Sequence, residues 1–156
     1  MNEYMEKATF AAGCFWHVEE VFMKTQGVKS TEVGYTDGHT DNPTYEDVCT
    51  DKTGHAEAIQ VEYDPDKISY SELVKVFFEN HNPTTPNRQG PDIGIQYRSA
   101  IFCHNAEQEQ FAKEVKEKLN PFAQKTFGHD IVTEIKSASK FYRAEEYHQK
   151  YLQKNS

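Results

Sequence analysis

The chain has 156 residues and a formal net charge of −8, with 37% hydrophobic and 13% aromatic residues. This length can form a hydrophobic core without disulfides or metals, so we expect a single domain over residues 1–156. The excess of acidic residues argues against nucleic acid and anionic membrane surfaces as partners. No apolar run in the sequence approaches the length that is needed to span a bilayer.

The cysteines and the N-terminus bear on the compartment in which the protein works. Residues Met1 to Lys7 are acidic and do not resemble an export signal. Three cysteines without such a signal are typical of a reducing compartment rather than of a disulfide framework. We therefore expect a cytoplasmic protein. We also expect a monomer, because no surplus apolar stripe is left over once the predicted elements have packed together.

Hydrophobic periodicity predicts strands and helices that alternate along the chain. The predicted strands cover residues 8–12, 28–35, 55–63, 99–103 and 130–136. The predicted helices cover residues 15–26, 69–80, 105–120 and 141–152, and one further helical turn lies at 44–49. Two strand–helix–strand halves with helices on one face favour an α+β fold, a two-layer α/β sandwich.

Capping residues and a proline indicate where two of the helices begin and end. Ser69 and Glu72 have the spacing of a capping box, and Asn105 is a favoured N-cap residue. Because proline lacks a backbone N–H and its ring clashes with the preceding turn, we expect Pro121 to end the helix that Asn105 begins.

The stretch Gly13-Cys14-Phe15-Trp16 joins the first predicted strand to the first predicted helix. Gly13 lies at the change of period, so Cys14 falls on the first helical turn, where unpaired backbone N–H groups and the helix dipole favour an anion. A thiol in this position tends to have a lowered pKa and to react as a thiolate. The alternative is a small buried cysteine that only packs the joint between strand and helix.

Glu57 lies in the predicted strand 55–63, on the same face as the apolar side chains of Ile59 and Val61. A buried carboxylate costs free energy unless it is protonated or paired, so the pKa of Glu57 is expected to be raised. An acid with a raised pKa can donate a proton near neutral pH, which makes Glu57 a candidate general acid. The alternative is that Glu57 lies at the end of the strand and reaches water.

Three kinds of chemistry can be considered for Cys14. A metal site is disfavoured, because Cys14 and His17 are not joined by a second close pair of ligands at a usual spacing. A Cys–His hydrolase stays open, because His17, His55 or His148 could serve as the base if the fold brought one of them to Cys14.

The third kind of chemistry is redox chemistry at one thiolate, assisted by an acid. Phe15 and Trp16 would form an apolar wall beside the sulfur, and Glu57 would supply a proton. The irregular segments 37–54 and 83–96 would bring further polar groups to the site, such as those of Tyr45, Asp92 and Tyr97.

The stretch around Cys14 resembles the signature of the peptide methionine sulfoxide reductase A family. Further segments between residues 8 and 152 resemble the family in order and spacing: Gly34-Tyr35, Asn42-Pro43-Thr44-Tyr45, Val48-Cys49, Thr53-Gly54-His55-Ala56-Glu57, Tyr63-Asp64-Pro65, Asp92-Ile93-Gly94, Gln96-Tyr97-Arg98-Ser99 and Tyr147-His148. An ordered set of this size is far more specific than a single Gly-Cys-Phe-Trp stretch.

The resemblance implies a reductase for the S epimer of methionine sulfoxide in peptides, proteins and the free amino acid. It implies no metal or organic cofactor, and a sandwich with a ferredoxin-like core. Cys14 resembles the nucleophile that attacks the sulfoxide sulfur and becomes a sulfenic acid, and Glu57 the acid that protonates the sulfoxide oxygen. The other matching residues resemble those that bind the oxygen, order the site and hold the substrate methyl group: Tyr45 and Tyr97, Asp92, and Phe15 and Trp16, respectively.

The sulfenic acid must be reduced before another turnover. Many relatives use a cysteine near the C-terminus or three residues after the nucleophile, but this chain has no cysteine after Cys103 and has His17 at the second position. Cys103 lies in an apolar strand and is expected to be a core residue. Cys49 is the remaining candidate for a resolving cysteine. We favour a mechanism in which an external thiol, thioredoxin-like or small, attacks the sulfenic acid directly.

Two residues depart from the family's usual pattern. Pro91 stands beside Asp92 where relatives usually carry Asn, and Asp37 stands where they often carry Gly. Pro91 is expected to alter the loop that presents Asp92, but neither change removes a reacting group.

Overall fold

The computed structural model describes residues 4–155, so the first three residues of the acidic N-terminal segment and Ser156 lie outside the described residues. The main sheet contains β1 (Glu6–Ala11), β2 (Val28–Thr36), β3 (Ala56–Tyr63), β6 (Ala100–Cys103), β7 (Glu134–Ser137) and β8 (Phe141–Arg143). A separate hairpin contains β4 (Arg88–Gln89) and β5 (Asp92–Ile93). The helices are α1 (Phe15–Met23), α2 (Tyr45–Cys49), α3 (Tyr70–Glu79), α4 (Ala106–Phe127) and α5 (Tyr151–Lys154), with short 3-10 turns η1 (Ile95–Tyr97) and η2 (Glu146–His148).

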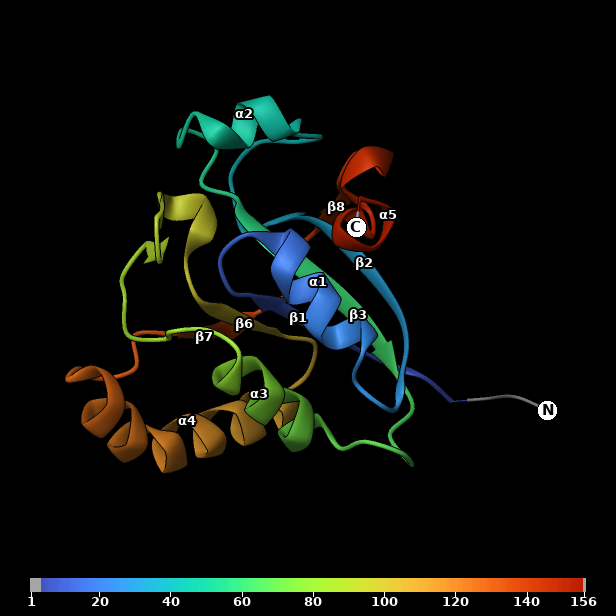
Figure 1. Ribbon diagram of the computed structural model, residues 1–156. Helices are drawn as coiled ribbons and strands as arrows, with labels where there is room; N and C mark the ends of the chain where they lie inside the picture. The colour runs from blue at the N-terminus through green and yellow to red at the C-terminus, as the bar shows by residue number, and fades with distance from the viewer. Residues whose placement is uncertain (1–3, 156) are drawn as a thin grey trace.

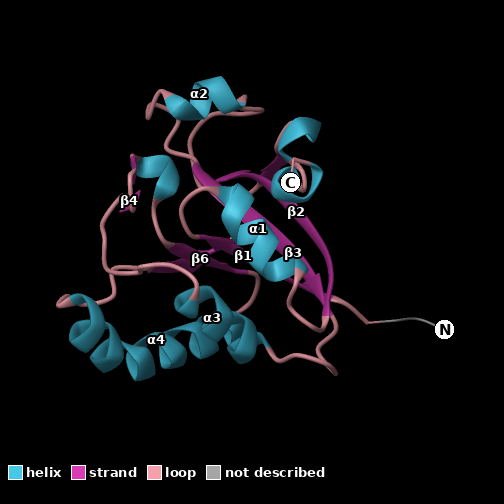
Figure 2. Cartoon of the chain, in the orientation of Figure 1, coloured by secondary structure: helices cyan, strands magenta, loops and turns pink. Residues whose placement is uncertain are grey.

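The strands of the main sheet lie in the order β7-β6-β1-β3-β2-β8 (Figure 1). Neighbouring strands are antiparallel, except for β6 and β7, which are parallel. Figure 2 shows that α2 and the β4–β5 hairpin lie toward the same end of the molecule as the start of α1, where long loops connect the elements. The chain therefore has a mixed α+β fold in which irregular segments gather at one end of the sheet.

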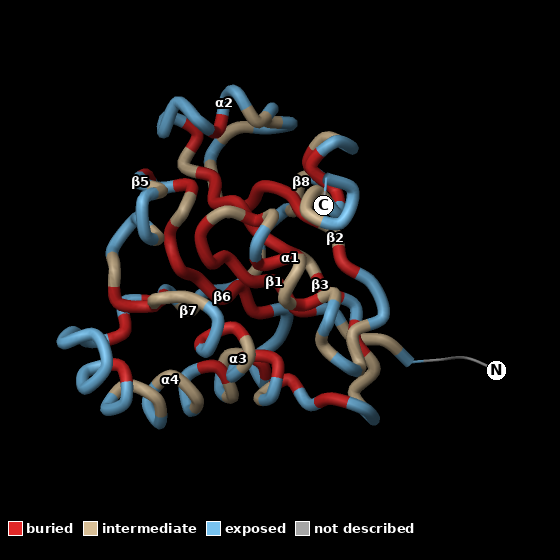
Figure 3. Tube along the Cα trace, in the orientation of Figure 1, coloured by how far each residue is buried: buried red, intermediate tan, exposed pale blue. Residues whose placement is uncertain are grey.

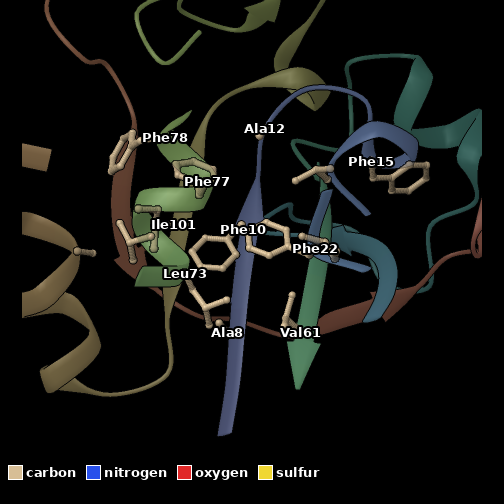
Figure 4. Close-up of a cluster of buried hydrophobic side chains, with 14 of the residues drawn as sticks. Ala8, Phe10, Ala12, Phe15, Phe22, Val61, Leu73, Phe77, Phe78 and Ile101 are labelled. Carbon is tan, nitrogen blue, oxygen red and sulfur yellow. The ribbon is translucent and has the colours of Figure 1, made fainter. Parts of the chain in front are cut away.

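The main hydrophobic core lies between one face of the sheet and the helices α1, α3 and α4. Phe10 of β1 is fully buried, and its ring stacks on Phe22 of α1 and Phe77 of α3 at centroid distances of 5.1 and 5.3 Å. Figure 4 shows these rings meeting between the strand and the two helices. Phe15, Val18 and Phe22 are all buried, which confirms the apolar stripe that the spacing predicts for α1.

The opposite face of the sheet carries a smaller cluster with mostly small side chains: Ala11, Ala56, Ala58, Ala100 and Phe102. The segment around Ala138 and Phe141 packs against this cluster. In Figure 3 the buried parts of the chain run through the central strands, while the outer turns of α4 are exposed. Small residues on this face need little covering, whereas the larger side chains of the other face pack against α1, α3 and α4.

Helix α4 corrects the prediction that Pro121 ends the helix, since Pro121 lies inside it and α4 continues to Phe127. Pro121 and Glu117, whose carbonyl loses its helical partner, are both exposed, so water can satisfy that oxygen. Ala123 in the next turn is buried against the core, which favours continuing the helix. The predicted caps are confirmed: Asn105 caps α4, and Ser69 begins α3 with a capping box.

The C-terminal region corrects a second prediction, that residues 141–152 form one helix. Residues 141–143 form strand β8, which pairs with β2, and only residues 151–154 form an α-helix. The edge of β2 needs hydrogen-bond partners, and Gln149 supplies them by accepting from the backbone N–H of Val33 and donating to its carbonyl. These partners come from far along the chain, so the local pattern does not reveal them.

Other predicted bounds differ from the observed ones by a few residues. Helix α1 ends at Met23 rather than at residue 26, and the strand predicted at 130–136 is confined to residues 134–137. Within residues 4–155, no helix is both long and apolar enough to cross a membrane.

Candidate active site

The turn between β1 and α1 presents Cys14 at the N-cap of the helix, and α1 begins at Phe15, as the sequence predicts. Gly13 makes this turn possible, because its φ is 79° and a Cβ there would lie 2.8 Å from the side chain of Gln89. The β4–β5 hairpin therefore packs directly against the turn. The Cys14 side chain is partly exposed, so its sulfur can be reached from solvent.

The pKa of the Cys14 thiol is raised to about 11, which shows that the prediction of a lowered pKa is wrong for the resting protein. Burial is the largest cause, and the charges of Glu57 and Asp92 raise the pKa further. The backbone N–H groups of Trp16 and His17 lower it, as expected at a helix start, but they do not outweigh burial.

Glu57 lies on β3 with only 1% of its surface exposed, which confirms that it is on the buried face. Its Oε1 accepts a hydrogen bond from the backbone N–H of Phe15 at 3.3 Å, and its Oε2 accepts one from the amide of Gln96 at 2.7 Å. Burial raises the pKa of Glu57 to about 7, against the lowering effect of these two donors. The carboxyl group is thus hydrogen-bonded to Phe15, the residue that follows Cys14 in the chain. With a pKa of about 7, it can exchange a proton near neutral pH.

Two tyrosines and an aspartate converge on this carboxyl group. Tyr45 begins α2, Tyr97 ends the turn η1, and Asp92 lies on β5. Burial raises the pKa of Tyr97 to about 12, and the charges of Glu57 and Asp92 contribute. Burial also raises the pKa of Tyr45, again with a contribution from Glu57. Both phenols therefore stay protonated at neutral pH and can donate hydrogen bonds.

The apolar side of the site is built on α1. Phe15 is fully buried, and the indole of Trp16 stacks on Tyr151 at a centroid distance of 3.7 Å. Trp16 Nε1 donates a hydrogen bond of 3.0 Å to Nδ1 of His148, whose ring also lies 5.1 Å from that of Phe15. His148 and Tyr151 of the C-terminal segment therefore hold the apolar wall that Phe15 and Trp16 form.

Sequence reasoning missed two residues that orient the site. Gln96 is buried and donates to Glu57, and Glu145 accepts from the hydroxyl of Tyr35 at 2.8 Å and from the backbone N–H of Tyr45 at 2.9 Å. Gln96 precedes Tyr97 in a motif that resembles the family, so the sequence could have indicated Gln96 as a residue of the site. Glu145 has no such signal, because its partners are 100 and 110 residues away.

The histidines that a hydrolase would need are engaged elsewhere or exposed. Nδ1 of His148 accepts from Trp16, and His55 bonds to the backbone of Gly38 and Thr40. His17 is exposed. Among residues 4–155, no group of three His, Cys, Asp or Glu side chains is arranged to hold a metal ion.

The other two cysteines differ in their surroundings. Cys103 is 5% exposed within β6, which confirms the prediction of a core residue. Cys49 is exposed at the end of α2, and its sulfur lies 3.6 Å from the amide nitrogen of Gln96. All three cysteines are free thiols.

The two departures from the family pattern are accommodated locally. Asp37 has a φ of 72°, a conformation that suits glycine, and its carboxylate pairs with Arg98 at 3.0 Å and Lys136 at 2.9 Å. Pro91 is exposed in the tight turn between β4 and β5, directly before Asp92.

Comparison with known proteins places these features in a family. A model described as peptide methionine sulfoxide reductase matches residues 6–156. The protein named peptide methionine sulfoxide reductase MsrA from Methanothermobacter thermautotrophicus is 58% identical over 150 residues, which are 96% of this chain and 88% of that one. The MsrA protein of Geobacter metallireducens is 55% identical over 96% of this chain and 91% of its own.

Solved structures agree with the sequence comparison. Methionine sulfoxide reductase A of Corynebacterium diphtheriae matches with a TM-score of 0.92 and 41% identity, over 97% of this chain and 75% of that one. Saccharomyces cerevisiae Mxr1 in complex with Trx2 matches with a TM-score of 0.64 and 29% identity, over 94% of this chain and 84% of that one. The chain therefore belongs to the peptide methionine sulfoxide reductase family.

Proposed function

We propose that this protein reduces the S epimer of methionine sulfoxide, in peptides, in proteins and as the free amino acid, with Cys14 as the nucleophile and Glu57 as the acid. Reduction of peptide methionine sulfoxide is the activity of the family to which the chain belongs. The observation that carries the assignment of roles is a buried carboxyl group, with its pKa near 7, hydrogen-bonded to the residue after a partly exposed cysteine.

The reaction begins when the Cys14 sulfur attacks the sulfoxide sulfur, which carries partial positive charge. A new S–S contact forms while Glu57 gives its proton to the sulfoxide oxygen, whose negative charge grows as the S–O bond weakens. The protonated oxygen then forms a bond to the Cys14 sulfur, while its bond to the substrate sulfur and the S–S contact both break; Cys14 becomes a sulfenic acid and methionine leaves as the thioether. Cys14 is oxidised by two electrons and the sulfoxide is reduced by two.

Cys14 and Glu57 share the proton that this step needs. A thiol with a carboxylate and a thiolate with a carboxylic acid hold the same single proton, so no proton enters from outside when the pair becomes reactive. With pKa values of about 11 and about 7, the proton rests on Cys14. A bound sulfoxide favours its transfer, because the positive sulfur stabilises the thiolate and the negative oxygen accepts a hydrogen bond from the protonated Glu57.

The remaining residues bind the substrate. The hydroxyl groups of Tyr45 and Tyr97 donate hydrogen bonds to the sulfoxide oxygen, and Asp92 orders the site from the β4–β5 hairpin. Phe15 and Trp16 hold the methyl group of the substrate. A contact with one methyl group discriminates by only about 1–3 kcal/mol, so the hydrogen bonds to oxygen supply most of the specificity.

Recycling uses an external thiol. The thiolate of a thioredoxin-like protein or of a small thiol attacks the Cys14 sulfenic acid, a disulfide forms and water leaves; a second thiol then releases Cys14. The crystal structure of yeast Mxr1 with Trx2 supports thioredoxin as the physiological type of reductant. Cys49 is the alternative, as a resolving cysteine within the chain.

We also propose a reducing, cytoplasmic location and a monomer that acts as one catalytic domain over residues 1–156, without a metal or organic cofactor. The three free thiols support a reducing location. The strand order β6-β1-β3-β2, with α1 and α3 as crossovers, supports the description of the core as ferredoxin-like.

Stereochemistry and pH dependence test the proposal. In single-turnover reactions with the separate epimers of an N-acylated methionine sulfoxide, we expect reduction of the S epimer only, and none by Cys14→Ser. The rate constant should rise with pH up to about 7 and then level. Below this pH the pair holds two protons and Cys14 remains a thiol, whereas above it the pair holds one.

The variant Glu57→Gln should slow the reductive step by about 10²-fold or more and remove the break near neutral pH, because an amide cannot give up a proton at this pH. Tyr4→Phe, which removes an exposed hydroxyl outside the site, is the matched control and should behave like the native protein. Native-like reduction by Glu57→Gln, or reduction of the R epimer, would contradict the proposal.

A further inference from the structure

The side-chain amide of Gln96 bridges two groups of the site that come from different elements. Its nitrogen lies 2.7 Å from Oε2 of Glu57 on β3 and 3.6 Å from the sulfur of Cys49 at the end of α2. Gln96 is 4% exposed, so this amide is sheltered from water. The amide nitrogen faces Glu57 and donates to its ionised form, which can only accept hydrogen bonds, and the second hydrogen of the amide is directed to the sulfur.

The backbone on both sides of Gln96 is held by contacts from other parts of the chain. The backbone N–H of Ile95 donates to the carboxylate of Asp51 at 3.1 Å. The guanidinium of Arg98 donates to the carbonyl of Ile95 at 2.9 Å and pairs with Asp37 and Glu134. These contacts hold the turn η1 in place and so fix the position from which the Gln96 side chain reaches Glu57.

We propose that Gln96 is the positioning residue of the general acid: it holds the second oxygen of Glu57, and the Cys49 thiol serves as a support for its amide. This inference rests on the proposed role of Glu57 as the acid. The other oxygen is held by the backbone N–H of Phe15, so the two donors together fix the plane of the carboxyl group beside Cys14. Cys49 then orients the acid rather than resolving the sulfenic acid.

A hydrogen-bond donor to the Glu57 carboxylate also keeps the pKa of Glu57 low enough for the acid to give up its proton near neutral pH. The bond from Gln96 stabilises the ionised form and so opposes the raising of the Glu57 pKa by burial. No cation is among the causes of its pKa shift, and the titratable groups that face Glu57 come from five elements: Cys14, Tyr35, Tyr45, Asp92 and Tyr97. Their charged forms are all negative, so Gln96 and Phe15 are the groups that restrain the rise.

Replacing Gln96 by Met tests the proposal, because Met keeps the length of the side chain but has no donor. A hydrogen bond to a charged group corresponds to about one to two pH units, so we expect the break in the single-turnover pH profile to move up by about that much. The rate constant above the break should fall by about tenfold or more, because the carboxyl group is no longer held. Cys49→Ala should move the break in the same direction by less.

The matched control is Gln108→Met, since Gln108 is also 4% exposed but bonds to Lys7 and His104 away from the site. The Gln108→Met variant should have a lower free energy of unfolding, but the break in its single-turnover pH profile should stay at the native pH. Infrared titration of the protonated Glu57 carboxyl, in a Cys14→Ser background and identified as the band that Glu57→Gln removes, measures the same shift without catalysis.

The two readouts separate the inference from the function on which it rests. If Gln96→Met leaves the infrared titration of Glu57 unchanged, the positioning role is wrong, whatever the activity. If the titration shifts but Glu57→Gln reduces sulfoxide at the native rate, the role of Gln96 stands and the assignment of Glu57 as the acid is wrong.

Discussion

The thiol of Cys14 lies where two backbone N–H groups lower its pKa, yet burial and the charges of Glu57 and Asp92 raise the pKa to about 11. A thiol is oxidised much more slowly than a thiolate. We therefore expect Cys14 to react slowly with oxidants while the site is empty, and we expect a bound sulfoxide to favour transfer of the proton toward Glu57. The selectivity of the nucleophile thus depends on its surroundings as much as on its place at a helix start.

A second property at the scale of single residues is the orientation of the Trp16 indole, which His148 holds by a hydrogen bond. Nδ1 of His148 accepts the indole N–H, so the proton of the neutral ring is on Nε2, which has no hydrogen-bond partner. Burial lowers the pKa of His148, which keeps the ring neutral and able to accept. Protonation would place a second hydrogen opposite that of the indole and break the contact.

Substitution of His148 by Phe removes this acceptor but keeps a ring of similar size. We expect KM for the S-sulfoxide to rise by about tenfold, with a smaller change in kcat, because Trp16 of the proposed methyl-binding wall loses its hydrogen bond. Trp16 is the only tryptophan, so its quenching by acrylamide reports the wall directly and should increase. His148→Asn keeps an acceptor near the position of Nδ1 and should retain more of both properties. An unchanged KM and quenching in His148→Phe would contradict this role.

At the scale of elements, the C-terminal segment 144–151 is held by side chains that bond to backbone rather than by a regular helix. Glu145 bonds to the start of α2, and Glu19 of α1 accepts from the backbone N–H of Lys150. Gln149 is 4% exposed and bonds to both backbone groups of Val33 and to the carbonyl of Ala144. The segment ties α1, β2 and α2 together beside the site.

Gln149→Ala would leave the buried N–H of Val33 without a partner, and the carbonyl of Val33 would keep only the backbone N–H of Ala144 as its donor. We expect the free energy of unfolding, measured by urea denaturation, to fall by about 2–4 kcal/mol. Gln110→Ala removes an exposed glutamine from α4 and should change it by less than about 0.5 kcal/mol. Equal effects of the two substitutions would show that the segment does not depend on Gln149.

At the scale of the whole molecule, the fold gathers Cys14, Glu57 and Gln96 at one end of the sheet while Cys103 remains in the core, on β6. Cys49 is the only other cysteine near the site among the described residues, and its sulfur contacts the amide that holds Glu57. This arrangement favours reduction by a partner thiol that approaches the exposed side of Cys14.

Mass spectrometry after one equivalent of S-sulfoxide tests this recycling route. We expect a sulfenic acid on Cys14 that dimedone traps, and its loss on addition of dithiothreitol or of reduced thioredoxin. Cys14→Ser is the control and should give no adduct. A Cys14–Cys49 disulfide in most molecules would instead establish Cys49 as the resolving cysteine.

The helix caps, the apolar stripe of α1 and the burial of Glu57 follow from the sequence, because each depends on residues within a few positions of one another. The ends of α4 and of the C-terminal region do not, because a buried Ala123 and the edge of β2 outweigh local preference. Proline and helix propensities are weak compared with such tertiary contacts.

The sequence by itself determined the family, through an ordered set of short motifs, and with it the identity of the candidate nucleophile and acid. Only the tertiary structure decided the direction in which the pKa of Cys14 shifts, the partner of Trp16 and the contacts of Gln96. These properties depend on burial and on contacts between residues that are 39 to 132 positions apart. Motifs record which groups are present, whereas their pKa values and orientations depend on what the fold packs around them.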